Sequence, residues 1–105
     1  MKKILTIALL FSFNVLAADA DYKLIIKDHR FEPGELTVPA SKKLTLLIEN
    51  QDSTPEEFDS HALNREKMIS AHGTIKLYIG PLNPGSYAFD GEFHAETAKG
   101  TLIAR

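Results

Sequence analysis

Side chains that can ligate a metal occur in three short stretches of this 105-residue sequence. One stretch pairs a carboxylate with an imidazole, one holds two adjacent glutamates, and one combines carboxylates with an imidazole. Carboxylate and imidazole ligands together suit Fe, Mn, Cu(II) or Zn better than Cu(I). The candidate metal ligands are Asp28, His29, Glu56, Glu57, Glu92 and His94. The alternative is that these are solvated turn carboxylates and a surface or strand-capping histidine.

The sequence contains no cysteine. A thiolate nucleophile, a soft thiolate metal site and a disulfide are therefore excluded. Small secreted domains often depend on disulfides, so this chain should be held together by a continuous hydrophobic core. There is no nucleophile-elbow serine, no Gly-rich phosphate loop and no His-Glu-x-x-His run. We therefore assign no catalytic residue.

The N-terminal residues have the features of a secretory signal peptide. Lys2 and Lys3 precede an apolar run at 4–13, which is too short to span a bilayer. Cleavage is expected after Ala17, with a second possible site after Ala20, and the alternative is an uncleaved membrane anchor. The sequence thus predicts a signal peptide at 1–17 and one domain at 18–105. The domain would be periplasmic, with no stable membrane insertion after cleavage.

The predicted domain is acidic. Loss of Lys2 and Lys3 changes the formal net charge from −2 to −4. No basic stripe is present to neutralise phosphates, which argues against a nucleic-acid partner and against an anionic membrane surface. An acidic surface is compatible with cations.

Hydrophobic and polar residues alternate with a period of two in short runs punctuated by Gly and Pro. This pattern is typical of an all-β sandwich or barrel. The clearest runs lie at 22–27, 35–38, 44–49, 74–79, 87–89 and 101–104. The large side chains expected in the core are Tyr22, Phe31, Phe58, Met68, Tyr87 and Phe89. His61 and His72 are expected in solvent-facing turns away from the candidate site.

Residues 53–70 have two possible structures. Ser53 and Pro55 would suit a helix start, followed by acidic residues in the first turn. However, the apolar residues that follow make a poor helical stripe. We therefore predict strands at 56–60 and 66–70, joined by a turn at 61–64.

Four motifs carry a resemblance to a known family. They are FEPGELTV at 31–38, PGSYAF at 84–89, DGEFH at 90–94 and KGTLI at 99–103. The chain resembles the cupredoxins, in which a PGxYxF strand leads into a ligand loop and a GxLxV strand follows. More specifically, it looks like the EfeO-type cupredoxin-like domain, which is associated with bacterial iron uptake. The resemblance implies a Greek-key β-sandwich of seven to eight strands, with the three candidate stretches at one end.

The resemblance also shows which copper ligands are missing. The position of the upstream histidine falls on Glu56, that of the cysteine on Gly91, and that of the downstream histidine on His94. The axial methionine would fall near Thr97 or Ala98. Blue-copper chemistry needs the thiolate, so a type-1 copper site is excluded.

EfeO-type domains carry an acid, an aromatic residue and an acid after the turn, which matches Glu57-Phe58-Asp59. The resemblance therefore implies that Glu57 points into the site, with Glu56 as the second choice. Asp28 or His29 would assist His94, Glu57 and Glu92.

The function implied is that of a periplasmic protein that binds an iron or copper ion. Its partners would be an inner-membrane iron permease and other periplasmic iron-uptake proteins, to which it would pass metal or electrons. One alternative is a metal-free cupredoxin-fold interaction module. Another is a ferroxidase-like component of an iron permease system.

Overall fold

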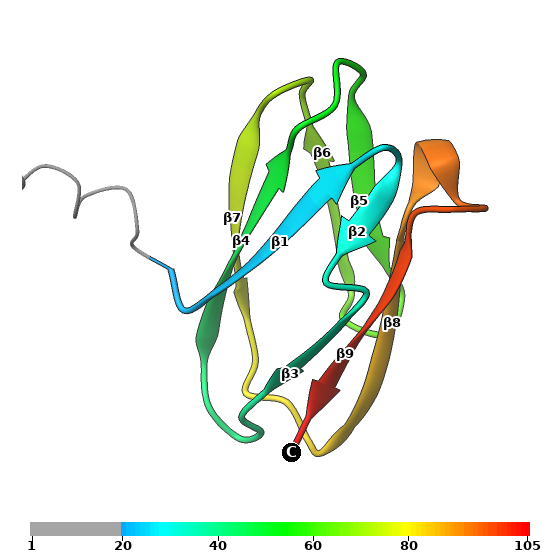
Figure 1. Cartoon of the computed structure of the whole chain (residues 1–105). Coiled ribbons are helices and arrows are strands. Elements are labelled where there is room, and N and C mark those ends of the chain that lie inside the picture. Colours follow the sequence, from blue (N-terminus) through cyan, green and yellow to red (C-terminus); the bar gives the residue numbers. More distant parts are fainter. Residues whose placement is uncertain (1–19) are drawn as a thin grey trace, which may run out of the picture.

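Two β-sheets pack face to face in the computed structural model, which describes residues 20–105 (Figure 1). The predicted signal peptide lies outside these residues. Within residues 20–105, no helix is both long enough and apolar enough to cross a membrane.

Nine strands and one short 3-10 helix, η2, make up the described part of the chain. They are β1 (Tyr22–Lys27), β2 (Arg30–Glu32), β3 (Glu35–Val38), β4 (Leu44–Asn50), β5 (Glu56–Ser60), β6 (Arg65–Ile69), β7 (Thr74–Ile79), β8 (Gly85–Gly91), η2 (Glu92–His94) and β9 (Lys99–Ala104).

The strands form a four-stranded sheet, in the order β2-β1-β4-β7, and a five-stranded sheet, in the order β3-β9-β8-β5-β6. The pairs β1–β4 and β3–β9 are parallel, and the other pairs are antiparallel. The β1–β2 turn, the start of β5 and η2 lie at one end of the sandwich (Figure 1). We call this end the loop end.

The core lies between the sheets because each strand buries every second side chain. β4 shows this most clearly, since Leu44, Leu46 and Ile48 are buried and the residues between them are partly exposed. In the second sheet Phe58 and Phe89 pack at a tilt of 33°, with their ring centroids 5.2 Å apart. The ring of Phe31, from β2, meets Phe89 edge-on at 4.9 Å. The core is therefore continuous, as expected for a chain that has no disulfides to stabilise it.

The predicted all-β sandwich is confirmed, with nine strands instead of seven or eight. The additional strand is β2, which at three residues is too short to display a periodicity. The strands predicted at 56–60 and 66–70 are present as β5 and β6. Met68 was expected in the core, and this was wrong: it pairs with Glu57 across β5 and β6 and is 54% exposed.

Phe58 is expected to be one of the most sensitive positions of the core. It is fully buried between two other aromatic rings, so Phe58→Ala should lower the free energy of unfolding by about 3–5 kcal/mol. Urea denaturation measures this loss. The matched control is Tyr78→Ala, which truncates a ring that is 68% exposed and should change stability by less than about 0.5 kcal/mol.

Candidate functional site

A buried carboxylate lies at the centre of the loop end. Glu56 begins β5 and faces the interior, where it is 1% exposed. Its Oε1 accepts hydrogen bonds from the backbone N–H groups of Glu57 (3.0 Å) and Phe93 (2.8 Å). Its Oε2 lies 2.7 Å from Nδ1 of His94. Because a carboxylate only accepts hydrogen bonds, the His94 nitrogen donates this one. We call Glu56 and His94 the inner pair.

Gly91 makes room for the inner pair. A Cβ atom at this position would lie 2.6 Å from Cδ and 2.7 Å from Oε2 of Glu56, and 2.9 Å from Cβ of Ala98. All three distances are shorter than real Cβ contacts. A side chain at the position at which the cupredoxin resemblance expects a cysteine would therefore force the Glu56 carboxylate to shift.

The ring of His29 stacks on that of His94. The ring centroids are 3.6 Å apart and the planes differ by 9°. His29 and Asp28 form the tight turn between β1 and β2, and both have positive φ, as a type I′ hairpin turn requires. Two parallel rings at this spacing do not direct their nitrogens toward one ion, so the stack is a packing contact and not a chelating arrangement.

Asp52 fixes this turn from the neighbouring loop. Its two carboxylate oxygens accept the backbone N–H groups of Asp28 (2.8 Å) and His29 (2.9 Å). Burial opposes ionisation of Asp52, but these two hydrogen bonds and the nearby His29 and His94 outweigh it and lower its pKa. The Asp52 N–H is in turn held by Oδ1 of Asn50, which is fully buried. A chain of polar contacts thus runs from β4 to the turn that carries His29.

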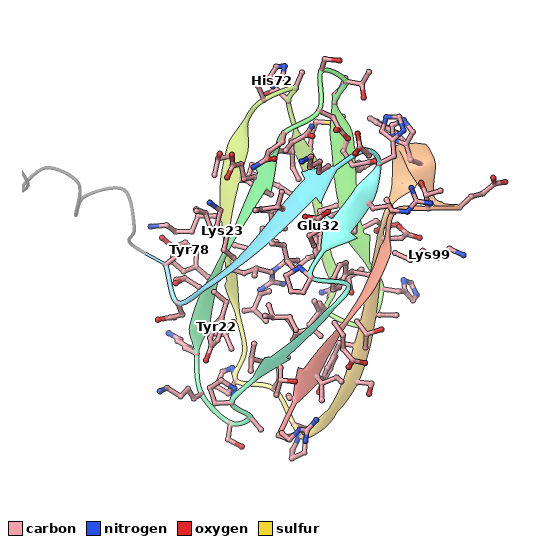
Figure 2. The ribbon with its side chains drawn as sticks, viewed as in Figure 1. Tyr22, Lys23, Glu32, His72, Tyr78 and Lys99 are labelled. Carbon is pink, nitrogen blue, oxygen red and sulfur yellow. The ribbon has the colours of Figure 1, made fainter. Side chains whose placement is uncertain are left out.

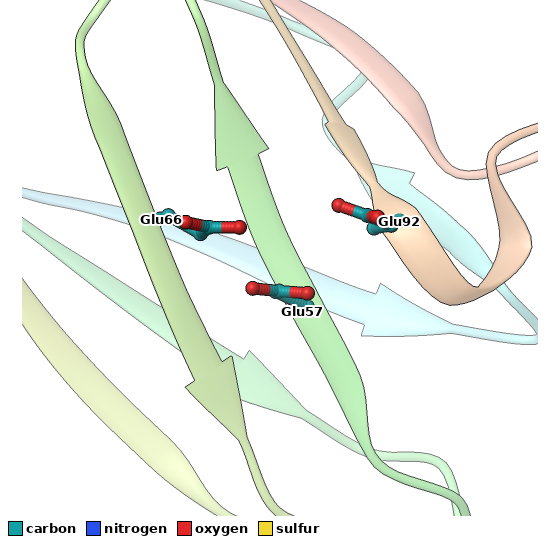
Figure 3. A group of neighbouring side chains, drawn as sticks. All are labelled: Glu57, Glu66 and Glu92. Atoms are coloured by element: carbon teal, nitrogen blue, oxygen red, sulfur yellow. The ribbon is translucent and has the colours of Figure 1, made fainter.

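On the opposite face of β5, three carboxylates come together (Figure 3). Glu57 comes from β5, Glu66 from β6 and Glu92 from η2, and each offers an oxygen within 4.8 Å of the other two. Glu57 is half-buried, and the other two are exposed. We call this group the carboxylate triad.

The pKa values of two members of the triad are raised. A hydrogen bond shared with Glu66 raises the pKa of Glu57, and partial burial and the charges of Glu66, Glu92 and Asp59 raise it further. The charge of Asp59, followed by partial burial and the charge of Glu66, raises the pKa of Glu92. Burial and the charge of Asp59 also raise the pKa of Asp90 on β8. The outer face of β5, β6 and β8 therefore concentrates negative charge, which a bound cation would neutralise.

The structure divides the six predicted ligands between the two faces of β5. Glu56, His94 and His29 lie together at the loop end, whereas Glu57 and Glu92 join Glu66 outside. The expectation that Glu57 points inward was wrong, because Glu56 is the buried glutamate. Asp28 takes part through its backbone N–H, in the bond to Asp52.

The two remaining histidines are exposed, as predicted. However, His72 lies at the loop end and not away from it (Figure 2), and its N–H donates to the carbonyl of Asp52. Sequence reasoning missed the roles of Asn50 and Asp52, and Glu66 was not among the predicted ligands. The inward orientation of Glu56 could have been inferred from the sequence. Phe58 was expected in the core, and it lies two residues further along the same strand.

The sequence matches the family described as "Cupredoxin-like domain" over residues 3–104. The chain belongs to this family. A curated relative is the uncharacterized protein RP394 of Rickettsia prowazekii (strain Madrid E), which is 47% identical over 83 residues. The match covers 79% of this chain and 66% of that relative, so the chain spans just under two thirds of its length.

Solved cupredoxins share the fold. Amicyanin from Paracoccus versutus superimposes with a TM-score of 0.66 and 19% identity, covering 84% of this chain and 83% of that one. The purple cupredoxin from Nitrosopumilus maritimus gives 0.62 and 18%, covering 81% and 100%. Auracyanin from Roseiflexus castenholzii gives 0.65 and 13%, covering 80% and 95%. At these identities the likeness shows the fold alone, and a type-1 copper site is excluded in this cupredoxin-like domain because it has no cysteine.

The first prediction for the site concerns Gly91. Gly91→Ala should destabilise the cupredoxin-like domain by about 1–3 kcal/mol, because the new methyl group is forced against the buried Glu56 carboxylate. The control is Gly34→Ala, where an added Cβ meets nothing within 4 Å and the change should stay within about 0.5 kcal/mol. Denaturant unfolding compares the two, and equal stability of both variants would contradict the proposed steric role.

The second prediction concerns pH. Because the pKa of Glu57 is raised in the folded state, its ionisation disfavours folding above its ordinary value of about 4.3. Glu57→Gln should therefore raise the thermal midpoint of the cation-free protein at pH 7. The gain should disappear as the pH falls below about 4, where the carboxyl is protonated in both states. Scanning calorimetry at the two pH values tests this, with Glu35→Gln on β3 as the charge-matched control.

Proposed function

We propose that this protein is an exported, periplasmic cation-binding protein that binds iron through the carboxylate triad and serves a bacterial iron-uptake system. The observation that carries the proposal is the approach of three carboxylates, from three separate elements, to within 4.8 Å of one another. Carboxylate oxygens are ligands for hard cations, and soft ions such as Cu(I) prefer sulfur. An oxygen-only set therefore favours iron over Cu(I).

Electrostatics supports the same proposal. The hydrogen bond with Glu66 is the main cause of the raised pKa of Glu57, and the charge of Asp59 is the main cause of the raised pKa of Glu92. The like charges around both glutamates repel them as well. A multivalent cation between them would convert this repulsion into attraction. The residues of the inner pair are already satisfied by each other, and so the outer face is the more accessible place for a metal.

Export and the iron-uptake partner rest on sequence features. The N-terminal residues have the pattern of a signal peptide, and the motifs resemble those of EfeO-type domains. The proposed recipient of the ion is an inner-membrane iron permease.

A second candidate function is a metal-free interaction module. The exposed apolar side chains of Met68 and Phe93, which are 54% and 46% exposed, favour it. Met68 pairs with Glu57 across β5 and β6, and Phe93 follows Glu92 in η2. A protein partner could contact these side chains beside the triad.

Isothermal titration of residues 18–105 with Fe(II) under anaerobic conditions, Fe(III)-citrate, Mn(II) and Cu(II) tests the proposal. We expect an iron dissociation constant below about 1 mM and a loss of at least about tenfold in Glu66→Gln, which removes the negative charge of one of the three ligands. Iron at 100 times the dissociation constant should also stabilise the fold by about 2.7 kcal/mol. Glu35→Gln should bind like the unmodified protein.

Two results would contradict the proposal. One is the absence of iron binding, with no effect of metals on the melting temperature, which would favour the interaction module. The other is iron binding that is unchanged in Glu66→Gln but lost in His94→Ala, which would move the site to the inner pair.

A further inference from the structure

The buried Glu56 lies directly behind the carboxylate triad. Its Oε1 accepts the N–H of Glu57, which is itself a triad residue, and the N–H of Phe93, which follows the triad residue Glu92. One oxygen atom therefore joins the backbone of β5 to that of η2. These are two of the three elements that supply the triad.

The η2 helix needs this external support. It is three residues long, and its N-cap residue, Gly91, makes no side-chain capping bond. The first N–H groups of a helix lack partners within the helix, and Phe93 finds its partner in Glu56. At the other end of η2, the carbonyl of His94 accepts the N–H groups of Thr97 and Ala98.

Burial makes the Glu56 contacts hard to replace. At 1% exposure, little water can substitute for a lost acceptor, and hydrogen bonds to a charged group are about twice as strong as neutral ones. The second oxygen of Glu56 is fixed by His94, so the carboxylate cannot turn away from the two N–H groups without losing that bond as well.

We propose that Glu56 is the positioning residue of the carboxylate triad: it holds η2 on β5 and thereby sets the spacing between Glu57 and Glu92. This inference rests on the proposed function. Gly91 serves the same arrangement, because it leaves the space that the Glu56 carboxylate fills. His94 is then a support for Glu56 and not a ligand of the ion.

Variants at position 56 separate the contributions of the two oxygens. Glu56→Gln keeps Oε1 as an acceptor for both N–H groups, and its new amide can donate to the other tautomer of His94. Glu56→Met fills a similar volume and accepts from neither N–H group. Glu56→Asp keeps the charge but is one methylene too short to hold both. The matched control is Ser60→Ala, since Ser60 is also buried, faces inward on β5 and bonds to Ala88 and Leu63.

Mn(II) affinity is measured for each folded variant by titration, with folding checked by circular dichroism. Loss of a residue that orients metal ligands typically costs about 10- to 100-fold in affinity, and this is the loss expected for Glu56→Met, with a similar trend in Glu56→Asp. Glu56→Gln and Ser60→Ala should remain within about threefold of the unmodified protein. Affinity that is unchanged in both Glu56→Met and Glu56→Asp would overturn the inference.

Amide hydrogen exchange gives a readout that needs no metal. The Phe93 N–H should exchange at least about tenfold faster in Glu56→Met and in Glu56→Asp, and at its normal rate in Glu56→Gln. Unchanged protection of Phe93 in both of the first two variants would overturn the inference. If the unmodified protein binds no cation at all, the proposed function fails, while the exchange rates still decide whether Glu56 holds η2 on β5.

Discussion

The loop end of this protein depends on one buried carboxylate whose hydrogen bonds are all provided by the protein. An unpaired buried charge would be very costly, and Glu56 avoids that cost by accepting two backbone N–H groups and the imidazole of His94. Its neighbours follow from this requirement. Gly91 must lack a side chain, η2 must turn its first N–H groups toward β5, and His94 must present Nδ1 inward with His29 stacked on it.

Alternation along β5 gives two adjacent glutamates opposite environments. Successive side chains of a strand point to opposite faces of the sheet, so Glu56 is buried while Glu57 faces outward beside Glu66 and Glu92. The inner glutamate has its charge compensated within the protein, and the outer one faces like charges. One face of the strand therefore holds β5 to η2, and the other gathers negative charge.

The sequence was informative where a pattern was long or a motif specific. The alternation in 74–79 and the PGSYAF motif were enough for the sandwich, whereas β2 was too short to be detected. The inward orientation of Glu56 could have been inferred from the predicted strand and from the expected burial of Phe58. The family resemblance favoured Glu57 instead and led to the wrong choice. The surroundings of Glu66 and Met68 are set by the register between β5 and β6. The role of Asp52 is set by its hydrogen bond with Asp28, which lies 24 residues away in the sequence. Such tertiary contacts leave no local pattern in the sequence.

The fit between Gly91 and Glu56 has a consequence for how such a domain can change by mutation. A cysteine introduced first at position 91 collides with the glutamate. A replacement of Glu56 that comes first and cannot accept hydrogen bonds leaves two backbone N–H groups and an imidazole without their acceptor. With such a replacement, either order passes through a destabilised intermediate, and the two positions are epistatic. A change from a loop end built around a buried carboxylate to one with a thiolate metal centre therefore requires single-substitution intermediates of lower stability.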